Sequence, residues 1–253
     1  LFDNLRLVFH DSEVEFRQGE KATEYLHSQG GKFRVYSPSY SLPQHTTAFY
    51  GLELADGIDP LQLRSYSQFF ERASGVENAS YSVTLPFYKT ANPSVDNQYS
   101  QPNLNLLGLL NVQYVVSEFE LNIPGLKYLQ KIESSWIYEN TEAFPRVWVQ
   151  DGLSNSIREV GEAAVQDYSP NLIEIAATGP GLLVLSEINY PGWKATVDGI
   201  PASIQDYHGI LRAIDLPEGT HAVKFTFYPV GVFLGVGISL LMLIGIWLNY
   251  RLD

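Results

Sequence analysis

The chain of 253 residues contains no cysteine, which excludes disulfide bridges, thiolate metal sites and cysteine nucleophiles. It is also poor in basic residues, with 16 Lys and Arg against 28 Asp and Glu, and its formal net charge is −12. Because nucleic-acid binding relies on neutralising phosphates, this balance argues against a nucleic-acid partner. P-loop, GxGxxG, serine-elbow and zinc-ligand patterns are absent as well. We therefore expect neither a cofactor nor a metal site.

Charge is missing from one long run, residues 230–248, which reads VGVFLGVGISLLMLIGIWL. At about 1.5 Å rise per residue this run reaches roughly 28 Å, close to the thickness of a hydrocarbon core. Tyr228, Trp247 and Tyr250 lie near its ends, where interfacial aromatic residues occur. The run predicts a transmembrane helix over residues 229–250, and the alternative is a buried core helix.

The orientation of this predicted helix rests on its flanking charges. Arg251 follows the run directly, while Lys224 precedes it, and the excess of positive charge marks the cytoplasmic side of a membrane helix. We expect a cytoplasmic C-terminus and an extracytoplasmic position for residues 1–228. The only methionine is Met242 and the first residue is Leu1, so we expect the sequence to be part of a longer protein.

Helix and strand signals alternate in residues 1–145, which predicts a mixed α/β domain. The clearest helix signal is the stretch 56–75, DGIDPLQLRSYSQFFERASG. In it, Asp59 is the expected N-cap and Gln62 can close a capping box. Apolar residues then recur at helical spacing, and Gly75 is expected to end the helix.

Residues 146–228 contain short β-branched and aromatic runs separated by turn formers, which predicts an antiparallel β-sandwich domain. Two of the expected turns are Gly179-Pro180-Gly181 and Pro217-Glu218-Gly219. The strands are expected at Arg146–Val149, Ala163–Tyr168, Leu172–Ala177, Leu182–Ile188, Trp193–Val197, Ile210–Asp215 and Ala222–Phe227.

Several phrases, taken in order, resemble one family of membrane proteins. They are FRVYSPSYSLPQHTTAFYGLELADGIDPLQLRSYSQFF, LNLLGLLNVQYVV, FPRVWVQ, INYPGWKATVDGIPASIQDYHGILRAIDLPEGTHAVKFTFYP and the closing apolar run. Together they cover roughly residues 32–248. In this order they resemble the C-terminal region of YfhO-type bacterial membrane proteins.

This resemblance implies a parent protein similar to GT-C-like glycosyltransferases, which take a sugar from a polyprenyl-phosphate donor outside the cytoplasmic membrane. It implies envelope polymers such as teichoic acids as acceptors, and further membrane helices N-terminal to this region. The catalytic acids of such enzymes are expected in an early loop that this chain does not include. The resemblance therefore transfers no catalytic residue to this sequence.

Two polar groups in residues 1–145 invite a chemical interpretation. Asp56 and Asp59 are paired carboxylates that could serve glycosyl chemistry, and Arg64 could bind a phosphate or carboxylate through its planar guanidinium. A turn aspartate, a helix cap and a surface arginine are the structural alternatives, and these are the commoner case. The HDSE group at 10–13 lacks a further metal ligand and is expected to be a solvated turn.

The aromatic residues of the predicted sandwich raise the possibility of sugar binding. Trp193 shares a strand face with Ala195 and Val197, so we expect its ring to point into the core. Tyr190, at the Pro191-Gly192 turn, is the better candidate for stacking on a sugar. Tyr207 and His208, in a later loop, are further candidates for binding.

The leading interpretation is an extracytoplasmic accessory region that positions an envelope glycan or polymer for a membrane glycosyltransferase. Its candidate substrate-binding residues are Tyr190, Tyr207, His208, Asp56 and Arg64. The expected partners are the lipid bilayer, a polyprenyl-phosphate sugar, an envelope glycan or teichoic acid, and the N-terminal membrane helices of the parent chain. A membrane-tethered carbohydrate-binding module and a purely structural spacer are the alternatives.

Overall fold

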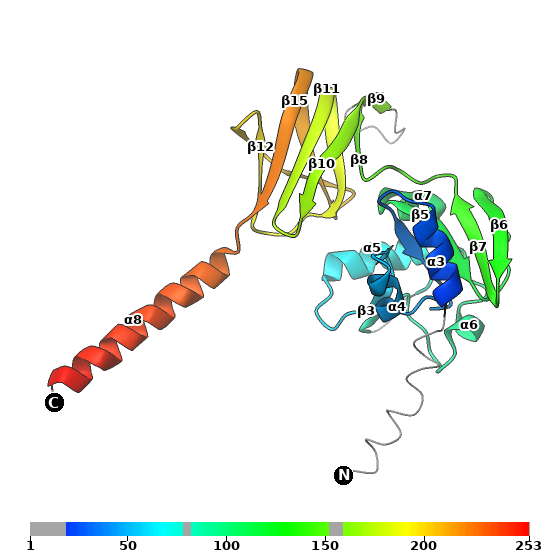
Figure 1. The fold of residues 1–253 in the computed structure, drawn as a ribbon, viewed down its shortest axis with the longest axis horizontal. Helices are drawn as coiled ribbons and strands as arrows, with labels where there is room; N and C mark the ends of the chain where they lie inside the picture. The colour runs from blue at the N-terminus through cyan, green and yellow to red at the C-terminus, as the bar shows by residue number, and fades with distance from the viewer. Residues whose placement is uncertain (1–18, 78–81, 152–158, 253) are drawn as a thin grey trace, which may run out of the picture. The chain divides into compact units, whose positions relative to one another are not determined.

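The structure, a computed structural model, describes residues 19–77, 82–151 and 159–252 (Figure 1). The HDSE group at 10–13 lies outside these residues. The chain divides into two compact units. The first unit contains the residues up to 147, together with 185–188 and 208–211, and the second contains 148–184, 189–207 and the residues from 212 onward.

A five-stranded sheet forms the centre of the first unit, with the strand order β2-β1-β5-β7-β6. Strand β1 runs parallel to both of its neighbours, whereas β7 pairs antiparallel with β5 and β6. The mixed α/β character predicted for this region is thus confirmed. The strands are β1 Arg34–Tyr36, β2 Glu53–Leu54, β5 Val112–Ser117, β6 Leu126–Ile132 and β7 Ser135–Asn140.

Short helices pack around this sheet. Helix α3 buries Ala22 and Leu26 against Val35, Val116 and Ile137 of the sheet, and these apolar side chains form one continuous core cluster. A separate two-stranded ribbon pairs β3, Gly57–Ile58, with β4, Thr84–Leu85. The helices are α3 Glu20–Ser28, α4 Gln44–Phe49, α5 Arg64–Ser74, α6 Pro93–Asp96 and α7 Leu104–Leu109.

The helix predicted to begin after Asp59 begins later, at Arg64. The β3–β4 ribbon holds the chain extended at this point, because the Asp59 backbone N–H donates to the Val83 carbonyl at 2.8 Å. The Asp59 carboxylate accepts from the Leu61 N–H at 2.8 Å and so closes a turn rather than capping the helix. The expected helix end is confirmed, since Gly75 is the C-cap with a φ of 68°.

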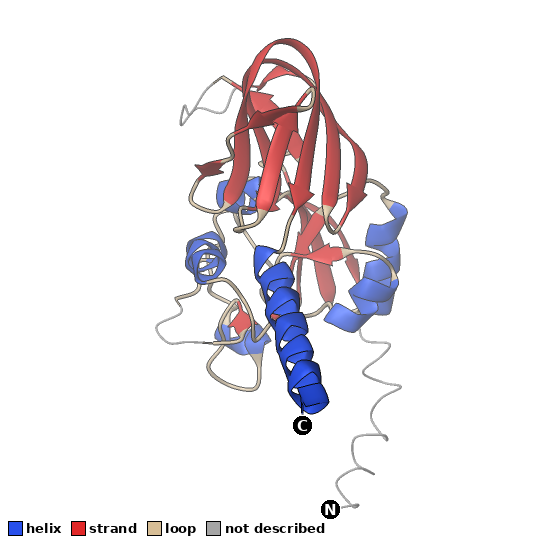
Figure 2. Ribbon diagram, turned by 90° about the vertical axis from the view of Figure 1, so that its left-hand side faces the viewer, coloured by secondary structure: helices blue, strands red, loops and turns tan. Residues whose placement is uncertain are grey.

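The second unit is built on one eight-stranded sheet, in which the pairs β8–β9, β10–β11, β12–β13 and β12–β15 are antiparallel. Figure 2 draws its strands as long, curved ribbons. An antiparallel sheet is therefore confirmed, while the sandwich form stays a prediction. The strands are β8 Val147–Gln150, β9 Glu159–Gly161, β10 Ala163–Ser169, β11 Leu172–Ile188, β12 Trp193–Val197, β13 Ile200–Ala202, β14 Gln205–Tyr207 and β15 Leu211–Phe227.

Two turns predicted in this region are wrong, because β11 and β15 run without interruption through Gly179-Pro180-Gly181 and Pro217-Glu218-Gly219. The two strands are neighbours in the sheet. A Cβ on Gly179 would lie only 2.1 Å from the Pro217 carbonyl oxygen. Glycine at this position therefore permits close approach of two backbones, which is the other role of glycine within a strand.

A single helix, α8, covers Val230–Leu252. Among the residues described, no helix is both long and apolar enough to cross a membrane. The C-terminal helix is thus confirmed, but its assignment as a transmembrane span over 229–250 is corrected.

Candidate functional site

An open groove of about 560 Å³ lies in the second unit, beside the first residues of β12. Its walls include Tyr190, Trp193 and Lys194, together with Asn189 and Asp206. The Asn189 amide donates to the Asp206 carboxylate at 2.7 Å, which fixes two polar side chains at the rim. The groove thus presents aromatic rings beside hydrogen-bonding groups. In ligand sites, such polar groups fix the orientation of a ligand that packs against the rings.

Tyr190 is the exposed aromatic residue of this groove, with 46% of its surface accessible. Its ring lies 6.2 Å from that of Phe227, at a tilt of 44°. The turn before β12 requires glycine at 192, where φ is 113° and a Cβ would lie 2.8 Å from the Phe227 ring. The structure therefore holds Tyr190 at the surface, where the sequence predicted it.

Trp193 differs from its predicted role as a buried residue of the core. Its side chain is half-buried and forms part of the groove wall. One face of the indole is covered by the guanidinium of Arg212 at 3.8 Å, and the Phe227 ring lies 5.4 Å away. Ala195, two residues along the same face, is buried, so the expected alternation holds inside β12 and weakens at its first residue.

Tyr207 is not available for ligand contact, which corrects the prediction. Only 3% of its surface is exposed, and its hydroxyl donates to the Gln150 side chain at 3.0 Å. Gln150 also accepts from the Trp148 indole at 2.9 Å, and the Trp148 and Tyr207 rings meet edge to face. Burial raises the pKa of the Tyr207 hydroxyl. The residue serves the core of the second unit.

His208 follows Tyr207 in the chain but belongs to the first unit. Its backbone has a φ of 52°, a conformation uncommon outside glycine. Loss of solvent around the ring lowers the pKa of His208, and the nearby Arg72 charge lowers it further. The five predicted binding residues are therefore divided, with Asp56, Arg64 and His208 in the first unit and Tyr190 and Tyr207 in the second.

Asp56 lines a pocket of about 300 Å³ within the first unit and is 6% exposed. Its Oδ1 accepts from the Ser37 N–H at 2.9 Å, whereas its Oδ2 has no partner among the described residues. Burial raises the pKa of this carboxyl to about 8. Burial also raises the pKa of Tyr36 well above its usual value, and the Asp56 charge adds to this. Asp56 is thus a buried, titratable group rather than a solvated turn residue.

Arg64 does not join Asp56. It is the first residue of α5, its side chain is exposed, and the described lining of the Asp56 pocket does not include it. The structure therefore supports the surface interpretation of this arginine.

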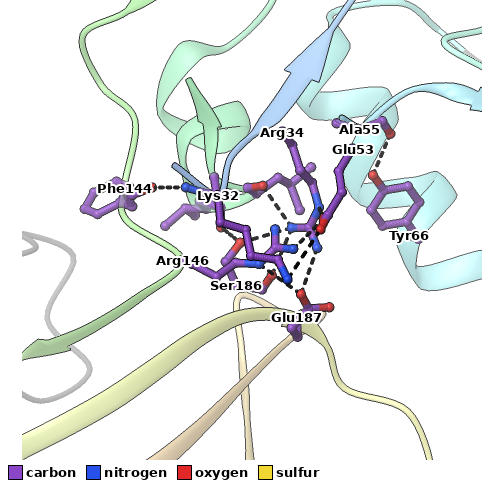
Figure 3. Close-up of polar contacts among 12 residues, drawn as sticks. Lys32, Arg34, Glu53, Ala55, Tyr66, Phe144, Arg146, Ser186 and Glu187 are labelled. Atoms are coloured by element: carbon purple, nitrogen blue, oxygen red, sulfur yellow. Dashed lines mark hydrogen bonds and ion pairs between the residues drawn. The ribbon is translucent and has the colours of Figure 1, made fainter. Parts of the chain in front are cut away.

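A charge network that the sequence did not reveal lies elsewhere in the first unit (Figure 3). Arg34 contacts Glu187 at 3.1 Å and Glu53 at 3.4 Å, and Arg146 pairs with the same two carboxylates. Arg34 also donates to the carbonyl oxygens of Leu110 and Ser186. Arg146 is only 5% exposed, so the network ties residues 186–187 to β1 and β2 through desolvated charges.

No sequence signal distinguishes these four charged residues from surface ones, because their partners are separated by many residues along the chain. Among the described residues, no group of three or more acidic or histidine side chains could hold a metal ion. No protein-family model matches the chain, and comparisons with curated proteins and with solved structures also give no match.

Proposed function

We propose that this chain is the extracytoplasmic accessory region of a bacterial membrane glycosyltransferase that uses a polyprenyl-phosphate sugar. In this proposal it positions an acceptor of the cell envelope, a glycan or a teichoic acid. The observation that carries the proposal is the groove of the second unit. Tyr190 and Trp193 offer ring faces for a sugar, and Asn189, Asp206 and Lys194 offer hydrogen bonds to its hydroxyl groups.

The position at the bacterial cytoplasmic membrane is part of the same proposal, as is the sandwich form of the second unit. It is supported by α8, in which the consecutive apolar residues 240–244 are all exposed. Since each residue advances the helix by about 100°, five consecutive residues pass more than once around it. A helix that is apolar on every side needs an apolar surrounding, which the other helices of a longer parent protein would supply.

Glycan binding is tested by titrating the full chain in detergent with purified teichoic acid and with short envelope oligosaccharides, followed by NMR. We expect saturable binding that weakens at least fivefold in Tyr190→Ala. Tyr99→Ala is the matched control, because Tyr99 is a tyrosine of the first unit that is 83% exposed. Binding that is unchanged by Tyr190→Ala, or absent at millimolar ligand, would contradict the proposal.

The same groove also fits a tethered carbohydrate-binding module without a role in sugar transfer. Deleting this whole chain from the parent enzyme separates the two functions. An accessory region predicts that transfer to polymer is lost while the donor lipid still binds. A binding module predicts that transfer continues and that only retention of the glycan is lost. A structural spacer predicts that the chain binds no glycan, so that the deletion removes no glycan binding.

A further inference from the structure

Two oxygen atoms face the two ring nitrogens of His221 in the second unit. Nδ1 of the ring lies 2.7 Å from Oδ2 of Asp198, and Nε2 lies 3.3 Å from the carbonyl oxygen of Glu218. A neutral imidazole has one N–H and can donate to only one of these acceptors, whereas the protonated ring donates to both. The side chain of His221 is only 13% exposed, so water has little access to replace a missing bond. The geometry therefore fits a protonated ring.

Asp198 brings a tight turn to this histidine. With Gly199 it forms the two-residue connection between β12 and β13, and φ is positive at both residues, 52° and 82°, as a type I′ hairpin turn requires. Oδ1 of Asp198 accepts from the Ala222 N–H at 2.8 Å, and the Asp198 N–H donates to the Ala222 carbonyl at 2.8 Å. The carboxylate thus joins its own turn to His221 and Ala222, two successive residues of β15.

The contact between the two side chains moves their pKa values in opposite directions. The hydrogen bond with Asp198 raises the pKa of His221, and the same bond lowers the pKa of Asp198. Partial loss of solvent opposes both shifts without reversing them. Each partner therefore favours the charged form of the other.

The neighbouring strand β11 makes two contacts of its own with this end of β15. Glu174 pairs with Lys224 at 2.9 Å, and the Thr178 hydroxyl lies 3.2 Å from that of Thr220. The carboxylate of Glu174 is thus engaged with a lysine, and the threonines carry no charge. Glu218, on β15 itself, has an exposed side chain. The charged partner of the histidine therefore comes from the turn between β12 and β13.

We propose that His221 is a pH-sensitive clamp, which fastens the β12–β13 turn to β15 when its ring is protonated and loosens that turn when the ring loses a proton. The carboxylate is the stronger acceptor, so the neutral ring keeps its proton on Nδ1. Nε2 then faces the Glu218 carbonyl as a second acceptor, and the ion pair with Asp198 becomes an ordinary hydrogen bond. The fastened hairpin supplies Pro201 and Ala202 to the groove, but the inference rests on these hydrogen bonds and not on glycan binding.

The directions of the two pKa shifts define the pH range of the clamp. The pKa of His221 is raised, so its contribution to stability is fully present below the unfolded pKa of about 6.5 and is lost as the pH rises through the folded pKa. The pKa of Asp198 is lowered, so its contribution is present above the unfolded pKa of about 3.9 and is lost as the pH falls through the folded pKa. The clamp is therefore complete between roughly pH 4 and pH 6.5.

The protonation of the ring is tested by NMR of the full chain with ¹⁵N-labelled histidine from pH 4.5 to pH 9, with His221→Gln to assign the signal. We expect both ring nitrogens of His221 to carry protons at low pH, and the neutral ring to carry its proton on Nδ1. Asp198→Asn keeps the shape of the side chain and suits the same turn, and it should shift the titration of His221 to lower pH. An unchanged titration in Asp198→Asn, or a neutral ring with its proton on Nε2, would overturn the proposal.

The loosening of the turn is tested by hydrogen exchange of the Ala222 amide, which donates to Asp198. Its protection factor, the exchange rate of an unstructured peptide divided by that of the protein at the same pH, should fall at least threefold between pH 6 and pH 8.5. In His221→Gln the side chain is neutral at both pH values, so the protection factor should stay within twofold.

His45→Gln is the matched control, because His45 lies in α4 of the first unit, and this variant should keep the threefold fall. The same pH dependence in wild type and His221→Gln would overturn the proposal. If His221→Gln does not fold, the position of the proton in the neutral wild-type ring still decides.

Discussion

The two units treat buried polar groups in different ways. The first unit buries ionisable side chains, Asp56 in a pocket and Arg146 in a charge network. The second unit buries mainly neutral polar groups, such as the Tyr207–Gln150 pair, and covers its buried Arg212 with an indole ring. The first unit therefore holds groups whose charge depends on surroundings and pH, while the second holds a fixed aromatic surface. The buried carboxyl whose pKa is raised to about 8, Asp56, thus belongs to the first unit.

The largest expected effect concerns Asp56 and the pH dependence of folding. Its pKa is raised to about 8 in the folded chain, so its contribution to stability is fully present below the unfolded pKa of about 3.9 and falls as the pH rises towards 8. The slope should approach about 1.4 kcal/mol per pH unit over this window. Asp56→Asn should remove it, as measured by urea unfolding from pH 4 to pH 9. Identical pH profiles for the two proteins would show that the pKa of Asp56 is not raised in the folded chain.

A smaller effect is expected from the charge network. Glu187→Ala should lower the free energy of unfolding by about 3–5 kcal/mol, because it removes the more buried of the two carboxylates that Arg34 and Arg146 share. Glu139→Ala is the matched control in the same unit, since Glu139 pairs with Lys127 at an exposed site. Its loss should be about 0.2–1 kcal/mol. Urea unfolding measures both, and equal losses would show that the network is no more desolvated than a surface pair.

The smallest effect is the difference between a buried and an exposed tyrosine hydroxyl in the second unit. Tyr207→Phe removes a buried hydroxyl that donates to Gln150, and should lower the free energy of unfolding by about 1–2 kcal/mol. Tyr190→Phe removes an exposed hydroxyl and should change it by less than about 0.5 kcal/mol. Thermal unfolding checks the pair. A larger loss for Tyr190→Phe would indicate that the groove residue, rather than the core residue, maintains the fold.

The sequence predicts local structure well where a pattern is local. The C-terminal helix, the Gly75 helix end and the positions of several strands follow from periodicity and turn formers. The start of α5 does not, because the pairing of Asp59 with Val83 depends on a segment more than 20 residues away. The continuity of β11 through Gly179 likewise depends on Pro217, which lies in another strand.

The candidate site shows the same limit. Tyr190 is predictable because a turn residue next to Pro-Gly stays at the surface. Asp56 is predictable as a residue of interest, but its burial is not, since a carboxylate before glycine reads as an exposed turn. The half-buried position of Trp193 arises from its place at the first residue of β12, where the covering side chain is Arg212, a contact that alternation within one strand does not indicate.

The glycine at 192 has an evolutionary consequence. Its positive φ and the short distance from a Cβ there to the Phe227 ring leave no room for a side chain. Under the proposed glycan-binding role, changes in the ligand that the groove accepts would therefore arise at its other positions, such as Lys194 and Asp206, which line the groove and expose their side chains. Among descendants of a common ancestor, residue 192 should stay glycine, while those two positions should differ between proteins that bind different ligands.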